Sequence, residues 1–405
     1  MIVDAVRTAV DRRYGVLSGW HPADLLAHLL TALPERTGLD PARVDDVVVG
    51  CGNPIGAQAA NVARAAVLAA GWPEAVAAVT VEAHHASGLR ALELGGHAVR
   101  SGAADLVVVG GVEVSSLVPA GAGLVPRDLG SPFPLSVTGR YDRRGGLPPP
   151  GVEAEQLAAR RGLTRADLDA WSAVSRTRAA AARQAGRFDA EIVPVPSRVL
   201  DRSSGRIVAG AAVTVDPGSG PSGTGALAAL PPLFRSNGVI TAGNRAVMGD
   251  GAAVVVLAGA PVAARLGLPV RARLASTVSV GVDPTAALGG TGVATDRLLR
   301  RASVRLGDLG LVELDESYAA AVLAWWADHP VDGARLNPTG GALATGHPGA
   351  ASGVRSLVSL VHGLARTGNR KGLVTAGGAG GVATAALVER SGSRPGPVRP
   401  TPIRR

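Results

Sequence analysis

The sequence predicts an α/β protein in which a largely parallel sheet is covered by helices on both faces. Apolar segments with strand character alternate with amphipathic helical segments through the first hundred residues. The same alternation returns near the C-terminal end, which indicates a duplicated α/β unit. Hydrophobic residues make up 46% of the 405 residues, so a large core is easily buried.

The first half contains three predicted strands and three predicted helices. The strands are short apolar runs rich in valine, as expected for buried strands, and they cover residues 44–51, 75–82 and 104–114. The helices have apolar residues at helical spacing and cover residues 22–38, 61–71 and 87–102. Strands that alternate with helices in this way favour parallel pairing, because each helix can carry the chain back across the sheet.

The second half repeats this order, with a strand predicted over 308–317, a helix over 318–329 and a strand over 371–381. One self-similarity is explicit. Residues 87–111 and 352–378 both run from Ser-Gly through a helix and a glycine-containing turn to a strand that ends in Gly-Gly. Duplication is the economical interpretation; two unrelated helix–strand units in a biased composition are the alternative.

Residues 118–236 change in character and read as an insertion between the two halves. They include a stretch rich in proline and glycine at 131–151 and a predicted helix at 164–186. Thr164 is expected to cap that helix, with Asp167 as its acidic third residue. Long insertions of this kind are often lids or substrate-binding regions.

The overall composition narrows the class of function. The formal charge is +9, but the basic residues are scattered and aromatic residues amount to 3%, so we expect no nucleic-acid partner. Diffuse positive charge better fits an anionic small molecule such as a nucleotide-bearing thioester. No apolar run is long enough to cross a membrane and no secretory signal pattern is present, so we expect a soluble cytoplasmic protein.

The segment "TVEAHHASGLRAL" (80–92) is the first candidate site. It passes from an apolar strand into a helix, a position where many enzymes carry a nucleophile. The segment has two histidines, His84 and His85, and no cysteine. The sole cysteine of the chain, Cys51, excludes an internal disulfide and lies in another strand–turn segment, where we expect a structural role.

Ordered segments across about residues 1–390 resemble the thiolase family. They include "NVARAAVLAAGWP" (61–73), "TAGNRAVMGDGAAVVVL" (241–257), "VELDESYAA" (312–320) and "NPTGGALATGHPGAASGVR" (337–355). The resemblance implies the thiolase fold, in which duplicated βαβαβαββ halves form five layers, αβαβα, with an inserted loop domain that binds coenzyme A. It also implies a homodimer or a homotetramer.

The resemblance sets the expected domain boundaries. Residues 1–117 together with 237–262 would form the N-terminal half, and residues 118–236 the loop and substrate-binding domain. Residues 263–391 would form the C-terminal half. Residues 392–405, which are rich in proline and arginine, would be a disordered tail, with contacts to anions as the alternative.

The family's nucleophilic cysteine corresponds to His85 here, and the residue before it is His84; a one-residue shift in register would exchange them. The second family cysteine has no counterpart, and Thr375 lies nearest to its position. The glycine-rich turn that follows, with Gly378 and Gly380, would border the coenzyme. Chemistry through a cysteinyl thioester is therefore not expected.

The other site positions are mixed. The histidine that the family uses as an oxyanion donor is retained as His347, whereas the asparagine that holds a catalytic water is Asp315. The next residue, Glu316, would help to hold the hydrogen bonds of the site. A serine that faces the coenzyme in the family is Ala246, and an asparagine is Gly249.

Each assignment has a structural alternative. His85 at a helix N-terminus would be neutral and could act as a base or nucleophile, or it could fill a retired position by drift. His84 could share that role or make a structural hydrogen bond. Asp315 could orient His85 as in a catalytic triad, or Asp315 and Glu316 could cap the following helix. Glu113 is expected to be structural, and the histidine spacing supports no metal site.

Two hypotheses follow. The first is a thiolase-like enzyme that acts on an acyl or 3-oxoacyl thioester of coenzyme A or a carrier protein, by acyl transfer, decarboxylation or cleavage, in a specialised biosynthetic pathway. It would need no permanently bound cofactor. The second is a non-catalytic protein of the same fold that binds a thioester or a partner subunit.

Overall fold

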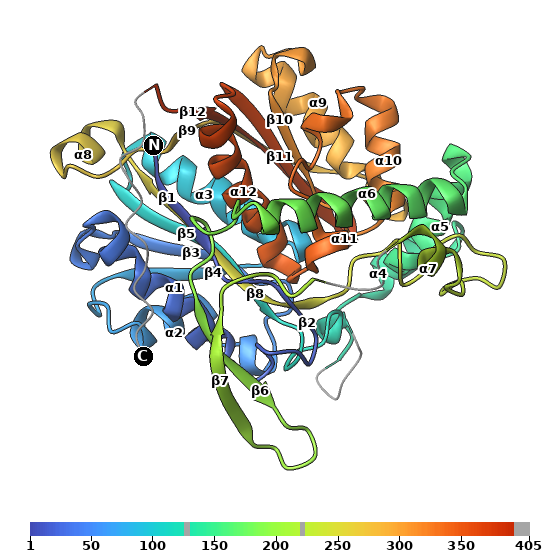
Figure 1. Ribbon diagram of the computed structural model, residues 1–405, viewed down its shortest axis with the longest axis horizontal. Coiled ribbons are helices and arrows are strands. Elements are labelled where there is room, and N and C mark those ends of the chain that lie inside the picture. The colour runs from blue at the N-terminus through green and yellow to red at the C-terminus, as the bar shows by residue number, and fades with distance from the viewer. Residues whose placement is uncertain (125–129, 219–222, 393–405) are drawn as a thin grey trace.

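The computed structural model in Figure 1 describes residues 1–124, 130–218 and 223–392. Within these residues a ten-stranded sheet runs through the molecule, with the strand order β10-β11-β12-β9-β1-β8-β5-β3-β4 and with β2 paired to β8. The strands are β1 (Ile2–Arg7), β2 (Asp11–Arg12), β3 (Asp46–Gly50), β4 (Ala77–Val81), β5 (Leu106–Val114), β8 (Gly249–Ala258), β9 (Ala272–Gly281), β10 (Leu311–Leu314), β11 (Lys371–Gly378) and β12 (Val382–Arg390).

The sheet is mixed, so the prediction of a largely parallel sheet is wrong. Only the pairs β3–β4, β3–β5 and β10–β11 are parallel among the described strands, and the other pairs are antiparallel. The physical reason lies in the connections. β11 and β12 are joined by a turn of three residues, Ala379–Gly381, which is too short for a parallel crossover. β1 pairs antiparallel with β8 and with β9, which both lie far along the chain from it, and the alternating pattern does not reveal these pairs.

The helices divide into three layers around the two halves of the sheet (Figure 1). One outer layer holds α1 (Pro22–Thr37) and α2 (Val62–Ala69), and the other holds α9 (Gly290–Ala302) and α10 (Ala319–Asp328). The middle layer holds α3 (Ser87–Ser101) and α12 (Ser352–Thr367), whose apolar residues pack with those of both sheet halves. Five layers result, as the thiolase resemblance implied.

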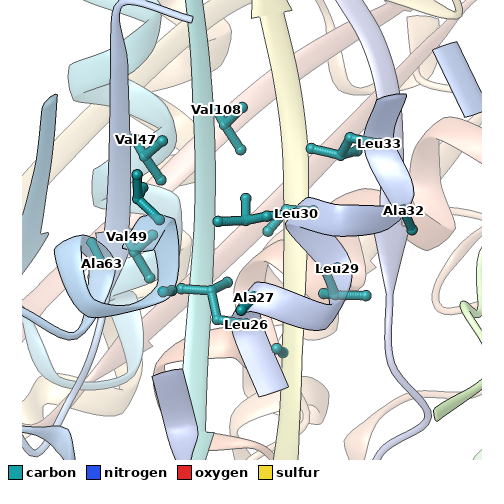
Figure 2. Packing of buried hydrophobic residues seen from close by; sticks show 14 of the residues in the cluster. Leu26, Ala27, Leu29, Leu30, Ala32, Leu33, Val47, Val49, Ala63 and Val108 are labelled. Atoms are coloured by element: carbon teal, nitrogen blue, oxygen red, sulfur yellow. The ribbon is translucent and has the colours of Figure 1, made fainter. Parts of the chain in front are cut away.

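The outer face of the N-terminal half shows how the pattern of α1 builds this packing. Leu26, Leu29, Leu30 and Leu33 recur at helical spacing and are buried. Figure 2 shows them in the same buried cluster as Val47 and Val49 of β3 and Val108 of β5. A complete burial of one such leucine is worth about 1.5–3 kcal/mol, so this face contributes strongly to folding.

The predicted strands and helices of both halves are confirmed at their positions, with one difference in burial. β4 forms where a strand was expected, but it lies at the edge of the sheet and is half exposed, with Val79 44% exposed. An edge strand has a partner on one side only, and apolar character by itself does not reveal that position.

Residues 118–236 contain elements that stand apart from the five layers. They are α4 (Leu135–Asp142), α5 (Pro150–Arg161), α6 (Arg165–Gln184), α7 (Thr224–Ala228) and the hairpin of β6 (Val195–Leu200) and β7 (Ile207–Val213). The expected helix is α6, and Thr164 and Asp167 form its capping box. Two short helices, α8 (Ala260–Arg265) and α11 (Ala342–Thr345), complete the set.

Two further expectations meet the structure only in part. The tail expected over residues 392–405 falls, apart from Gly392, outside the described residues. Among the helices that are described, none combines the length and the apolar character that crossing a bilayer requires.

Candidate active site

The two central helices bring two histidines together. A short helix, His84–Ala86, follows β4 and leads into α3, and His347 lies shortly before α12. Glycine at position 88 permits the close approach, because a Cβ there would lie 2.5 Å from the carbonyl oxygen of Ala350. The ring centroids of His85 and His347 are 4.7 Å apart, with the planes tilted by 46°.

Asp315 forms its hydrogen bond with His347 and not with His85. The distance from its Oδ1 to His347 Nε2 is 3.0 Å, and the carboxylate also accepts the hydroxyls of Ser317 and Ser352. The expected orientation of His85 by Asp315 is therefore wrong, because the strand β10 ends beside the His347 loop. The alternative of a helix cap is also wrong, since α10 is preceded by Tyr318 and has no side-chain cap.

Ser317 was missed from the sequence although it stands two residues after Asp315. Ser317, His347 and Asp315 are the residue types of a catalytic triad, but they are not arranged as in a triad. A triad places the serine and the carboxylate on opposite ring nitrogens. Here Ser317 Oγ lies 3.4 Å from the same Nε2 that faces Asp315. Nδ1 of His347 is buried and has no hydrogen-bond partner among the described residues.

The pKa values of His85 and Asp315 are shifted, and the causes of both shifts follow from this geometry. Burial lowers the pKa of His85 to about 3, and His347 adds to the effect, while Asp315 opposes it. Burial would raise the pKa of Asp315, but the charge and hydrogen bond of His347 and the hydroxyl of Ser317 outweigh it and lower that pKa to about 2. Near neutral pH, His85 is thus uncharged and Asp315 is a carboxylate.

His84 occupies a different environment from His85. Its backbone has φ of +51°, its N–H donates to the Glu82 carboxylate at 2.6 Å, and its Nδ1 lies 3.4 Å from the same carboxylate. The glycine-rich turn packs against both histidines. A Cβ at Gly378 would lie 3.0 Å from the backbone nitrogen of His85, and one at Gly380 would lie 3.2 Å from His84 Nε2. Glycine is therefore required for this close packing.

These residues border a cavity of about 600 Å³, a size suited to a small-molecule ligand. Its wall combines the site residues with apolar side chains and a few polar ones, some of which the sequence reasoning missed. The lining includes His84, His85, His347, Ser317, Ala246, Gly378, Ile55, Phe133, Phe234, Met248, Leu288, Glu82, Glu153, Arg245 and Tyr318. Arg245 could have been noticed as a long charged residue in a segment otherwise rich in small residues.

Asp315 and Gly380 contact residues of the lining but do not line the cavity themselves, and three further predicted site residues do not line it either. Thr375 lies within β11, on the face that carries Leu373, and its hydroxyl donates to the carbonyl of Thr384. Gly249 is the first residue of β8, and its N–H donates to the carbonyl of His347. This hydrogen bond holds the loop that contains His347 against β8.

Glu316 is the third such residue, and its contacts are structural. Its carboxylate accepts hydrogen bonds from Trp171 and Ser175 of α6, from Asn337 and from the backbone of Leu343. Four donors hold this buried carboxylate, so it connects α6 to the strand that carries Asp315.

Glu113 and Cys51 occupy the structural positions that were expected. Glu113 accepts hydrogen bonds from Gly52, Asn53, Gln58 and the backbone of Ala350. Cys51 is buried in the core beneath α1, and burial raises the pKa of its thiol, with the Glu113 carboxylate adding to the shift.

We predict that Cys51→Ala leaves thioester turnover within about twofold of wild type, at a cost of about 1 kcal/mol in stability. The thiol is buried, is outside the cavity and is held protonated, so it cannot act as a nucleophile there. Turnover assays before and after iodoacetamide treatment would check this. Inactivation of the wild type, but not of the variant, would contradict it.

The described residues hold no group of three or more His, Cys, Asp or Glu side chains placed to bind a metal. What the site offers is a neutral imidazole, a second imidazole paired with a carboxylate, and glycine-rich backbone at two helix N-termini. Such an arrangement can accept a proton and can stabilise negative charge on an oxygen.

Fold and site together define a class of proteins: duplicated five-layered α/β proteins with a polar site where their two central helices begin. Residues 1–260 match the model of the thiolase N-terminal domain, and residues 268–390 match that of the thiolase C-terminal domain. The chain belongs to the thiolase family.

Individual relatives are similar in sequence to this chain over nearly its whole length. The chain is 37% identical to a steroid 3-ketoacyl-CoA thiolase of Mycobacterium tuberculosis, over 96% of this chain and 93% of the relative. It is 41% identical to an acetyl-CoA acetyltransferase of Pseudomonas aeruginosa, over 95% and 98%. The crystal structure of human mitochondrial 3-ketoacyl-CoA thiolase superposes with a TM-score of 0.86 at 29% identity, and covers 96% of this chain and 98% of that one.

Proposed function

We propose that this protein is an acyltransferase-type enzyme that acts on an acyl or 3-oxoacyl thioester without forming an acyl-cysteine. The observation that carries the proposal is the contact between His85 and the His347–Asp315 pair at the wall of the cavity. The sole cysteine, Cys51, lies elsewhere in the core. The named relatives are thiolases and acetyltransferases of coenzyme A, which supports a thioester as the substrate.

In this proposal His85 occupies the position of the family nucleophile and accepts a proton. Its imidazole is neutral near pH 7, so a lone pair is available for water, for a carbon acid or for the nucleophile that receives the acyl group. His84, which contacts Glu82 at the cavity rim, plays no direct part. Decarboxylation, hydrolytic cleavage and direct transfer to a bound nucleophile all suit such a base.

His347 stabilises the developing oxyanion in this proposal. The Asp315 carboxylate lies 3.0 Å from Nε2 of His347, so that nitrogen is directed at Asp315. The buried Nδ1, which has no partner among the described residues, is the ring nitrogen that remains for a substrate oxygen. A donor held in place before the reaction stabilises the transition state without reorganisation.

The carrier of the acyl group is coenzyme A in this proposal, with an acyl carrier protein as the alternative. Ala246, Gly378 and Gly380 lie at or beside the cavity and offer small side chains where a pantetheine arm would pass. Residues 118–236 supply Phe133, Glu153 and Phe234 to the wall, which supports their proposed role as a substrate-binding region.

One observation favours the non-catalytic alternative. With a pKa of about 3, His85 is a weak base, and a weak base takes up a proton reluctantly unless negative charge develops beside it. A thioester-binding protein that shapes the activity of a partner would need no such proton transfer.

The deciding experiment is release of free coenzyme A from a panel of acyl-, malonyl- and 3-oxoacyl-CoA thioesters by the purified protein. Release above the uncatalysed rate from at least one thioester supports the enzyme. No release, together with micromolar binding of the same thioesters, would support the non-catalytic alternative. No release and no binding would reject coenzyme A as the carrier.

The family resemblance also leads us to propose a homodimer or homotetramer. The half-exposed edge strand β4, with Val79 open to solvent, offers a surface that a second copy would cover. We expect gel filtration with light scattering to give a dimer or tetramer at micromolar concentration. A clean monomer that persists as concentration rises would contradict this.

A further inference from the structure

Arg245 lies on the cavity wall, close to the site along the chain. Residue 245 pairs with Tyr318, the N–H of Ala246 donates to the carbonyl of Ser317 at 2.9 Å, and Met248 pairs with His347. Three residues span at most about 11 Å, so the backbone of Arg245 is within that distance of the residue that adjoins His347.

The guanidinium of Arg245 makes no ion pair and no hydrogen bond with any residue that the structure describes, and its Nε is buried. Some other buried arginines have counter-ions, whereas Arg355 likewise leaves its Nε and Nη1 without a partner among the described residues. Arg7 contacts Glu191 and Asp216, and Arg36 contacts Asp4. A partly buried charge without a partner is costly, and Arg245, unlike Arg355, borders a cavity in which an anionic ligand group can pair with it.

The two carboxylates that share the cavity wall are engaged elsewhere. Glu82 accepts the N–H of His84, and Glu153 accepts the N–H of Leu288 at 2.5 Å. Neither forms an ion pair with Arg245 within 4 Å, although both line the same space. The lining also includes the apolar residues Phe234, Leu288 and Met248, and Arg245 is its only arginine or lysine among the described residues.

We propose that Arg245 binds a carboxylate at the distal end of the acyl chain, so that the cavity prefers thioesters of dicarboxylic acids. This inference rests on the proposed function, because it places the thioester at His85 and His347. From there a short chain reaches Arg245 across the apolar wall. The coenzyme phosphates are the other anions of such a substrate, but the pantetheine arm carries them away from the thioester.

Equilibrium binding tests the proposal without relying on turnover. Calorimetric titrations in a His85→Ala background would compare glutaryl-CoA with pentanoyl-CoA, which has the same number of acyl carbons but no carboxylate. We expect glutaryl-CoA to bind roughly tenfold more tightly, since a charge-assisted pair is worth that much. Arg245→Met should abolish the preference and Arg245→Lys should retain part of it.

Arg297→Met is the matched control, because Arg297 is exposed on the outer helix α9. It should leave the preference intact, and thermal melts would confirm that each variant is folded. An equal affinity for both thioesters in the His85→Ala protein that retains Arg245 would overturn the proposal. So would an Arg245→Met variant that weakens free coenzyme A and both thioesters equally, which would assign the guanidinium to a coenzyme phosphate. Failure of turnover alone would reject the proposed function and leave this preference measurable.

Discussion

Replacing His85 by alanine is expected to lower kcat/KM for thioester turnover by about 10²–10⁴-fold, the range that a positioned general base contributes. The fold should persist, because His85 lies at the start of a helix and borders the cavity rather than the core. The measurement is release of coenzyme A by wild type and variant with the best thioester of the panel.

His84→Ala is the matched control, since its side chain contacts Glu82 and not His347. We expect a loss of less than about tenfold there, within the range left to a residue that makes no contact with the reacting atoms. Equal turnover by wild type and His85→Ala would remove His85 from the mechanism. A larger loss in His84→Ala than in His85→Ala would shift the register by one residue.

The dependence of kcat/KM on pH provides a second test of the role of His85. An ordinary histidine base would lose activity below about pH 6.5. Because burial lowers the pKa of His85 to about 3, the base remains unprotonated well below that pH. We expect kcat/KM to stay flat from pH 8 down to about pH 5. An acid limb centred near pH 6.5 would contradict this environment for His85.

Replacing Asp315 by asparagine is expected to lower kcat/KM by about 10²-fold, the typical loss for one oxyanion-stabilising donor. The amide keeps an oxygen for the Ser317 hydroxyl but removes the negative charge beside His347. His347→Asn should cost a similar amount. If the two residues act as one unit, the double variant should lose little more than either single variant, and kinetics of all four proteins would show this.

Glu316→Gln serves as the control for that cycle. It weakens a buried hydrogen-bond network one residue away without touching His347, so it should lower the melting temperature and spare kcat. Simple additivity of the Asp315 and His347 effects would separate the two residues and reject the paired role.

The Asp315–His347 pair also predicts an acid dependence of stability. The pKa of Asp315 is lowered to about 2 in the folded protein, against an ordinary value near 3.9. Its contribution to stability is therefore complete above about pH 4 and is lost as the pH falls towards 2. Urea unfolding across this range should show a shallower acid dependence for Asp315→Asn than for wild type. Identical pH dependence in both proteins would contradict the assigned shift.

Most of the elements could be predicted from the sequence, because apolar periodicity and capping are local. The helices over 22–38 and 164–186, the strand over 104–114 and the repeat that yields α3 and α12 all form where they were expected. The direction of strand pairing could not be predicted, because it does not depend on local sequence. It depends on how β1, β8, β9 and β12 return to the sheet, and no pattern within those strands encodes it.

The sequence by itself determined which chemical groups are available. It places His84 and His85 at a strand–helix junction and His347 before the second central helix, and it has no cysteine in either segment. Only the tertiary structure decided the pairings. Asp315 contacts His347 instead of His85, Thr375 faces away, and Arg245 lies on the cavity wall without an ion pair to any described residue. A hydrogen bond of about 3 Å forms only where two separate loops come together in the folded protein. Here their positions are set by the packing of α3 against α12, in which Gly88 approaches the carbonyl oxygen of Ala350, far along the chain.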